Sequence, residues 1–291
     1  MTTIAASSLT VARRAPVGNF SAWAMVAPFI LLLATFYAMP LFSVLWLSFS
    51  VPKLGFDNYL ALFSSSGLQR VLATTFRVSA LVTVFSLVLG YLIAYVMLNA
   101  GPRHRMAIAT FVLVPFWVSV LVRAFAWLTI LRSEGLLNTA LMSAGLIAQP
   151  LALVRNEFGV VLAMTHYMIP YAVLPIYSNM KGIDPRLASA SRSLGAGPVR
   201  TFTSIFLPLS MPGVFAAGLL VFILSLGFLV TPAIIGGGRV TMIAEYVRLQ
   251  IFQTVRWGVG TMMASVLLIT VLVLLAAMAR IVDVKKLFGA K

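Results

Sequence analysis

The chain has 291 residues, of which 61% are hydrophobic and 9% are charged, and its formal net charge is +15. Soluble domains carry about 25% charged residues, so this composition excludes an ordinary soluble protein. It also argues against nucleic-acid binding, because the chain has no folded soluble domain that could carry this function. The sequence contains no cysteine, which excludes a disulfide framework and a thiolate metal site.

Long apolar runs predict an all-α membrane protein with six transmembrane helices, because a helix needs about 20 apolar residues to cross a bilayer. We expect these spans near residues 21–47, 78–99, 107–131, 159–180, 211–235 and 259–281. With both termini inside, twelve of the 21 Lys and Arg residues fall in the short inner segments, in agreement with the positive-inside rule. The sequence thus predicts a cytoplasmic segment 1–20, one membrane domain 21–283 and a basic cytoplasmic tail 284–291.

The segment between the first two spans contains FDNYLALF, residues 56–63, which predicts a short amphipathic helix along the outer face. The third span contains Arg123 near its outer end. An arginine in a span is costly unless it snorkels, pairs with another group or faces a wet cavity. Snorkelling and a position on a translocation pathway both fit this pattern.

The fourth span contains Pro170 and Pro175, and their spacing of five residues predicts a bent or broken helix near the middle of the bilayer. His166 precedes them without a neighbouring carboxylate in the sequence. It fits a hydrogen-bonded bundle residue better than a proton relay.

Residues 184–209 form the longest segment that is neither apolar enough for a span nor a tail. Asp184 and Pro185 predict a helix start, with the aspartate as N-cap and the proline in the first turn. Gly195 predicts the helix end, and Gly197 and Pro198 begin a second short amphipathic helix that should end at Leu207-Pro208. Such a polar, basic helix–turn–helix cannot lie in hydrocarbon, so it must face water, the bilayer surface or a protein partner.

The fifth span leads into three consecutive glycines, 236–238, which fit a re-entrant turn, a gate or a flexible loop. Residues 242–253 then predict an amphipathic helix with Glu245 and Arg248 on its hydrated side.

Motifs for nucleotide binding and hydrolysis are missing from the sequence. A P-loop requires Gly-Lys followed by Ser or Thr, and no lysine of this chain follows a glycine. The sequence also lacks H-E-x-x-H, G-x-S-x-G and any close set of His and carboxylates suited to a metal. We therefore predict no catalytic residues, no metal site and no ATP site in this chain.

The segment 195–209 contains a spaced pattern made of Gly195, Ala196, Phe202, Ile205, Leu207, Pro208 and Leu209. This pattern resembles the cytoplasmic EAA loop of permease subunits of binding-protein-dependent ABC importers. Where that family usually has Glu-Ala-Ala, this chain has 189-Ser-Ala-Ser-191, so the salt bridge that the glutamate could make to the ATPase is not expected, although the docking shape is retained. Residues 115–138 and 168–187 resemble the spermidine/putrescine-type permeases of the same family.

This resemblance implies the type I ABC importer permease fold, with a cytoplasmic coupling helix between the fourth and fifth spans. It implies a location in the bacterial inner membrane and a second permease subunit, identical or paralogous. It further implies two cytoplasmic ATPase subunits that bind ATP and Mg²⁺, and a periplasmic solute-binding protein. The residues that the resemblance assigns to ATPase coupling are Arg186, Leu187, Ser189, Ala190, Ser191, Arg192, Leu194, Gly195, Leu207 and Pro208.

The resemblance also implies a small organic solute, a polyamine or a related cationic or amino compound. Aromatic rings hold cations, but the midplane carboxylates expected of a polyamine site are missing, so an amino-acid derivative stays open. A passive channel or a secondary carrier is the alternative, although an ion-coupled carrier would place an ionisable group near the midplane. The candidate pathway residues, for which bundle packing is the other interpretation, are Trp117, Arg123, Trp127, Tyr167, Tyr171, Phe228 and Thr231.

Overall fold

A computed structural model describes residues 19–281, and every regular element in this part of the chain is helical. The predicted N-terminal segment 1–20 and tail 284–291 lie almost wholly outside the described residues. The elements are α1 (Asn19–Leu33), η1 (Ala34–Ala38), α2 (Met39–Ser50), α3 (Asp57–Ser64), α4 (Ser66–Asn99), α5 (Pro102–Trp117), α6 (Val120–Leu131), α7 (Leu136–Ser143), α8 (Glu157–Lys181), α9 (Pro185–Ser193), α10 (Pro198–Thr201), η2 (Phe202–Phe206), α11 (Leu207–Leu226), α12 (Val230–Ile235), α13 (Ile243–Phe252) and α14 (Trp257–Ile281).

The chain divides into two compact units, Met1–Trp46 and Leu47–Lys291. In the first unit, α1 continues through the π-helical turn η1 into α2. A proline clashes with the carbonyl four residues before it, and the wider π turn lies directly before Pro40. The helix therefore continues past this proline, and Trp23–Ser50 is a candidate membrane span of 28 residues.

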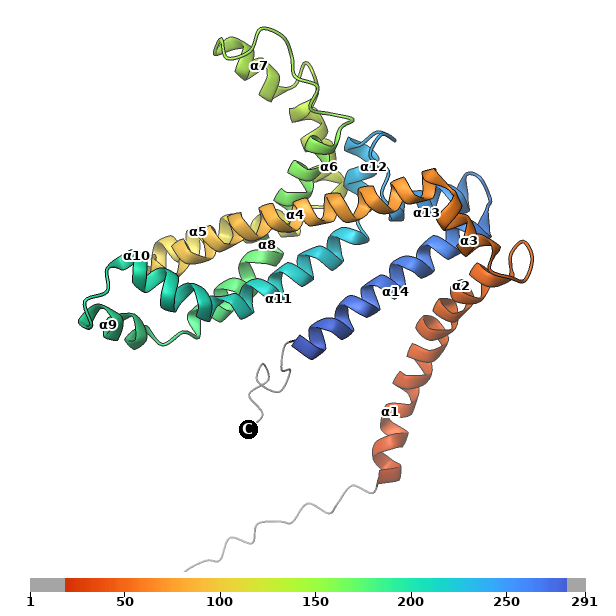
Figure 1. Ribbon diagram of the computed structural model, residues 1–291, viewed down its shortest axis with the longest axis horizontal. Helices are drawn as coiled ribbons and strands as arrows, with labels where there is room; N and C mark the ends of the chain where they lie inside the picture. The colour runs from red at the N-terminus through yellow and green to blue at the C-terminus, as the bar shows by residue number, and fades with distance from the viewer. Residues whose placement is uncertain (1–18, 282–291) are drawn as a thin grey trace, which may run out of the picture. The chain divides into compact units, whose positions relative to one another are not determined.

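Helices α4, α8 and α11 lie side by side in the second unit and form its core (Figure 1). Small residues allow this close packing: a Cβ on Gly90 of α4 would lie 2.7 Å from the Cβ of Ala172 on α8. Membrane helices associate through such small residues, because lipid supplies no hydrophobic force between them. Buried Val78, Met164 and Val221 belong to one apolar cluster shared by these helices.

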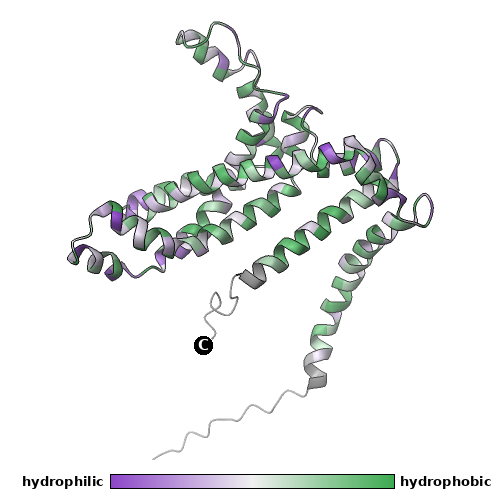
Figure 2. Ribbon diagram, viewed as in Figure 1, coloured by the Kyte–Doolittle hydropathy of each residue, from purple (hydrophilic) through white to green (hydrophobic). Residues whose placement is uncertain are grey.

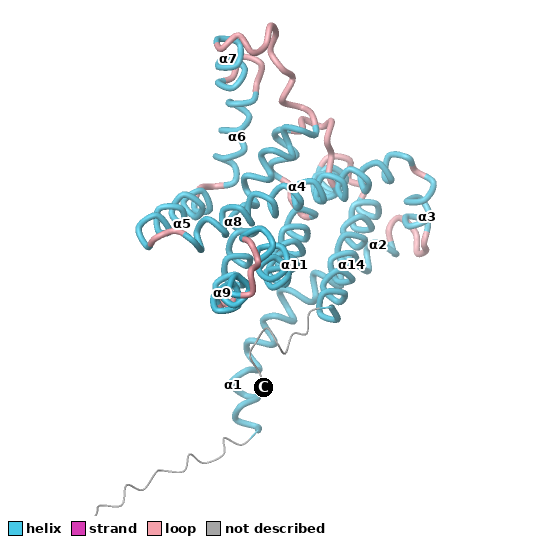
Figure 3. Tube along the Cα trace, turned by 60° about the vertical axis from the view of Figure 1, so that its left-hand side comes forward, coloured by secondary structure: helices cyan, strands magenta, loops and turns pink. Residues whose placement is uncertain are grey.

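Five described helices are long and apolar enough to cross a membrane, and a bent pair would make a sixth span. All-helical architecture and five to six spans confirm the predicted fold class. The third span, expected near residues 107–131, is broken, because α5 and the segment Val120–Ser143 meet at 101°. Val118 has an extended backbone after Pro115, Ser119 is also non-helical, and the two residues interrupt the helix. Consequently α6 and α7 extend away from the core helices (Figures 1 and 3).

The fourth span is not broken at its prolines, and the fifth span has other bounds than expected. Helix α8 is continuous from Glu157 to Lys181, with both prolines inside it. The predicted helix end at Leu207-Pro208 is wrong, because α10, η2 and α11 form one span from Pro198 to Leu226. The π turn η2 precedes Pro208 and accommodates its ring. Val230–Ile235, expected within the fifth span, forms the separate helix α12.

Short helices connect the spans at both ends of the second unit. The predicted amphipathic helices at 56–63 and 242–253 appear as α3 and α13. Helix α7 was not predicted, and Asn138 holds the loop around it by donating to Arg132 O and Leu151 O and accepting from Leu151 N. The hydrophilic residues gather at these connections, most clearly around α9 and α10, whereas the spans are hydrophobic (Figure 2).

Candidate functional site

Helix α9 begins as its sequence predicts. Asp184 has an extended backbone, and its Oδ1 accepts a hydrogen bond from Arg186 N at 2.8 Å. Pro185 occupies the first turn, where its missing N–H leaves no acceptor unsatisfied. A side-chain N-cap of this kind is worth about 1 kcal/mol, so the start of α9 is fixed by local interactions.

The end of α9 is fixed in the same local way. Gly195 has φ +84°, a conformation that favours glycine. Its N–H bonds to Arg192 O at 3.0 Å, and Ala196 N bonds to Ser191 O at 3.1 Å. This pair of bonds is the Schellman motif, which satisfies the last carbonyls of the helix. The predicted role of Gly195 as the helix stop is therefore confirmed.

The surface of α9 is open along its whole length, since no residue of this helix is buried. Leu187 is 44% exposed, and Leu194, just past the helix end, is 89% exposed. Eight of the ten predicted coupling residues lie in α9 or directly after it, and the other two, Leu207 and Pro208, begin α11. Arg186, Leu187, Ser189, Ala190, Arg192, Leu194, Gly195 and Pro208 are exposed, and Ser191 and Leu207 are half-buried. Ser191 Oγ lies 3.2 Å from Thr201 Oγ1, which ties α9 to α10.

A groove of about 550 Å³ separates α9 from the ends of the spans beneath it. Its walls come from α4, α8, α9 and the α10–η2 segment, and include Tyr95, Lys181, Leu187, Arg192 and Phe206. Helix α9 contacts α10 and η2, and these two elements join it to the fifth span.

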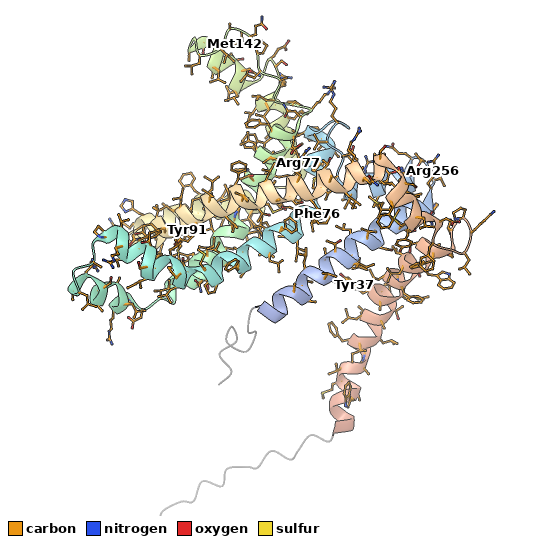
Figure 4. The ribbon with its side chains drawn as sticks, in the orientation of Figure 1. Tyr37, Phe76, Arg77, Tyr91, Met142 and Arg256 are labelled. Carbon is orange, nitrogen blue, oxygen red and sulfur yellow. The ribbon has the colours of Figure 1, made fainter. Side chains whose placement is uncertain are left out.

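Aromatic rings join η2 to α4. Phe202 and Phe206 stack on each other, and both meet the ring of Tyr95 edge to face. Tyr91 meets Phe202, and its hydroxyl lies 2.9 Å from Ser210 Oγ; Figure 4 shows Tyr91 on α4. π-helical turns often occur at functional sites, and here the turn lies where the polar segment joins the fifth span.

Asn179 completes this joint from α8. With its amide nitrogen facing α11, it donates to Leu209 O and Ser210 O, both at 3.2 Å. Gly213 permits this approach, since a Cβ there would lie 2.5 Å from Asn179 Cβ. Ser210 Oγ also donates to Leu207 O at 2.8 Å. Helices α4, α8 and α11 are therefore linked directly behind the α9–η2 segment.

A second constellation surrounds Arg123 and is called the Arg123 cluster below. The Arg123 guanidinium carbon lies 4.0 Å from the centroid of the Tyr167 ring. Tyr167 stacks on Tyr171 and meets Phe228 edge to face. Trp127 Nε1 donates to His166 Nδ1 at 3.4 Å. The cluster comprises Phe116, Arg123, Trp127, His166, Tyr167, Tyr171 and Phe228.

Five of the seven candidate pathway residues therefore lie in this cluster. The other two lie apart: Trp117 is 87% exposed at the end of α5, and Thr231 is buried in α12. The sequence analysis missed Phe116, because an apolar run gives no signal that this particular ring contacts Tyr171. The bundle interpretation of His166 agrees with its bond to Trp127.

Charged groups elsewhere in the described residues are sparse. Within residues 19–281 one ion pair occurs, between Arg77 on α4, labelled in Figure 4, and Glu157 on α8. No group of His, Asp and Glu in this part of the chain could hold a metal ion. The prediction that Glu245 faces water is wrong, because this side chain is 4% exposed and its Oε2 has no hydrogen-bond partner. Burial raises the pKa of Glu245, and Arg248 partly opposes this shift.

Comparison with known proteins agrees with this architecture. Residues 86–286 match the family "Binding-protein-dependent transport system inner membrane component". The spermidine/putrescine transport system permease protein PotB of Haemophilus influenzae is 30% identical over 205 residues, which cover 70% of this chain and 71% of that protein. PotB of Escherichia coli K12 is 29% identical over 204 residues, 70% of this chain and 74% of the relative.

Among solved structures, a bacterial alginate ABC transporter in complex with an alginate pentasaccharide-bound periplasmic protein contains a chain of similar fold. The TM-score is 0.74 at 20% identity, over 90% of this chain and 94% of the other. The family match covers more than half of the sequence, and the helical fold agrees with it. This chain therefore belongs to the inner membrane components of binding-protein-dependent transport systems and is a permease subunit of an ABC importer.

Proposed function

We propose that this permease is one of two membrane subunits that enclose the pathway of an ATP-driven importer, the other being a paralogue. Its termini lie in the cytoplasm, and a periplasmic binding protein delivers the solute. Two cytoplasmic ATPase subunits bind ATP and Mg²⁺ and receive α9. The solute is a polyamine or a related cationic or amino compound, a proposal that the PotB relatives support.

The observation that carries the proposal is the exposed, locally fixed α9. Both ends of this helix are capped by their own sequence, while Leu187 and Leu194 remain exposed. An apolar pair on a polar, basic surface is unfavourable in water and favourable in a partner's groove. A helix that is rigid before binding also loses little entropy when a partner covers it.

The attachments of α9 suit the transmission of force to the spans. Asn179, Ser210 and Tyr91 link α8, α11 and α4 directly behind it. A displacement of α9 would consequently move these helices together as a rigid body, a common form of switching. The chemistry of nucleotide hydrolysis stays in the ATPase, and this chain converts its closure into movement of the spans.

Co-purification tests the proposal. The tagged permease is co-expressed with its ATPase, and the recovered ATPase is quantified for the parent and for Leu187→Ser/Leu194→Ser. Burying a leucine is worth about 1.5–3 kcal/mol, so removing two should weaken binding by at least about tenfold. The control is Leu136→Ser on α7, where Leu136 is 72% exposed.

Full ATPase recovery and normal uptake with the double variant would contradict docking through α9. Uptake that follows an ion gradient without any ATPase would instead favour a secondary carrier.

A further inference from the structure

The Arg123 cluster contains a positive charge that the described residues do not balance. Arg123 Nε is buried without a hydrogen-bond partner. Within residues 19–281 no carboxylate lies within 4.0 Å of this guanidinium. The guanidinium lies over the Tyr167 ring, and this cation–π contact offsets part of the free-energy cost of burying the charge. The contact leaves N–H donors of the guanidinium without an acceptor. A half-buried arginine with free donors is costly unless an opposite charge joins it.

The break in the third span adds positive potential at the same place. Helix α6 starts at Val120, directly after the bend, and Arg123 lies in its first turn. Ser119 makes no side-chain hydrogen bond to cap this start. The first N–H groups of a helix have no intrahelical acceptor and form its positive end. Transporters with broken spans use such ends to hold anionic groups of solutes.

The aromatic rings beside Arg123 favour a positively charged group, whereas the guanidinium favours a negatively charged one. Tyr167 is partly covered by the guanidinium, but Tyr171 and Phe116 continue the aromatic surface, with centroids 5.3 Å apart. Ring faces attract ammonium groups, and guanidinium attracts carboxylates. One solute that carries both groups would satisfy both parts of the cluster.

We infer that the Arg123 cluster binds the carboxylate of the transported solute, which is therefore an amino carboxylate and not a bare polyamine. This inference rests on the proposed import function and narrows its solute class. The guanidinium donates to the carboxylate, and Tyr171 and Phe116 face the ammonium end. A diamine carries two positive charges, and Arg123 repels both of them.

Ornithine and putrescine provide a matched pair of probes, since putrescine is ornithine without its carboxylate. Equilibrium dialysis of each radiolabelled compound is performed on the detergent-purified complex, with the binding protein omitted so that its specificity does not intervene. We expect ornithine to bind at least about tenfold more tightly than putrescine, the effect of one charge-assisted hydrogen bond. Equal binding, tighter putrescine binding or no ornithine binding would overturn the inference.

Variants locate the carboxylate. Arg123→Gln should reduce ornithine affinity by about tenfold or more and leave putrescine affinity unchanged or higher, whereas Arg123→Lys should retain the preference for ornithine. The matched control Arg132→Gln changes an exposed arginine nine positions further along the chain and should leave both affinities unchanged. If Arg123→Gln does not fold, the comparison of ornithine and putrescine binding to the parent complex still tests whether the solute carries a carboxylate.

A lipid phosphate is the other anion that could reach this guanidinium. Dialysis is therefore repeated with added phosphatidylglycerol, and displacement of ornithine by the lipid would overturn the solute assignment. ATPase recovery with the Arg123 variants should equal that of the parent, because the cluster and α9 share no residue. Failure of the carboxylate site and failure of α9 docking thus give different readouts.

Discussion

Helices α9 and α13 are both short amphipathic helices between apolar runs, with nine and ten residues, yet their surroundings are opposite. No residue of α9 is buried, whereas α13 buries Ile243, Glu245 and Gln250. Helix α13 packs on α14, and Thr75 on α4 accepts its first N–H at 2.9 Å. An amphipathic pattern therefore identifies a helix with two faces, but the neighbouring helices determine which face is covered.

The comparison implies that α9 matters for transport and α13 for stability. Gly195→Asp should abolish uptake, because φ +84° strains any side chain and the charge lies at the bend after α9. No atom lies within 4 Å of the added Cβ, so the strain stays within the exposed turn and membrane insertion should remain near that of the parent. Uptake of labelled solute and the amount of protein in the membrane are measured together.

Gly197→Ala is the matched control, since Gly197 also has open space but φ −67°. Normal uptake with Gly195→Asp, or equal losses in both variants, would contradict the importance of the turn.

Truncating one apolar residue on α13 and one just past the end of α9 should show the opposite order of effects, with the larger loss of stability at α13. Ile243→Ala removes a side chain that is 1% exposed and should lower the free energy of unfolding by about 2–5 kcal/mol. Leu194→Ala removes one that is 89% exposed, and the change should stay within about 0.5 kcal/mol. Denaturant titration of the purified permease without ATPase, in one detergent, measures both. Similar losses would mean that α9 is covered within the isolated subunit.

A smaller gain or loss of stability than that of Ile243→Ala is expected at Glu245. Burial raises its pKa in the folded protein, so the folded state binds the proton more tightly than the unfolded state. Stability is then highest below the ordinary carboxyl pKa of 4.5 and falls as the pH rises from there through the folded pKa. Glu245→Gln should remove this dependence and raise the thermal midpoint at neutral pH by roughly 2–4 °C, the shift expected for about 1 kcal/mol.

Thermal midpoints of parent and variant are compared across the pH range from acid to neutral. A parent that gains stability as the pH rises through this window, without the same gain in Glu245→Gln, would mean that the carboxylate has a partner in the folded protein.

Local sequence determined the spans and the ends of α9. Hydrophobic runs of sufficient length specify membrane helices, since the bilayer demands internal hydrogen bonding over its thickness. Asp184, Pro185 and Gly195 act within one helical turn of themselves, so their roles could be predicted without a neighbour. The continuation past Pro208 could not, because a π turn before a proline leaves no simple sequence signal.

Only the tertiary structure decided the environment of the charged and aromatic residues. The Arg123 cluster joins α5, α6, α8 and the turn after α11. The hydrophobic pattern of the sequence is the same whether an aromatic ring faces lipid, another helix or an arginine, so the pattern could not predict these contacts. Glu245 follows the same rule, since its burial depends on helices packed against α13. The local sequence determines the helix ends, through short-range hydrogen bonds, and the spans, through the length of apolar runs. Long-range packing determines which helix faces contact one another, because these contacts join residues that lie far apart in the chain.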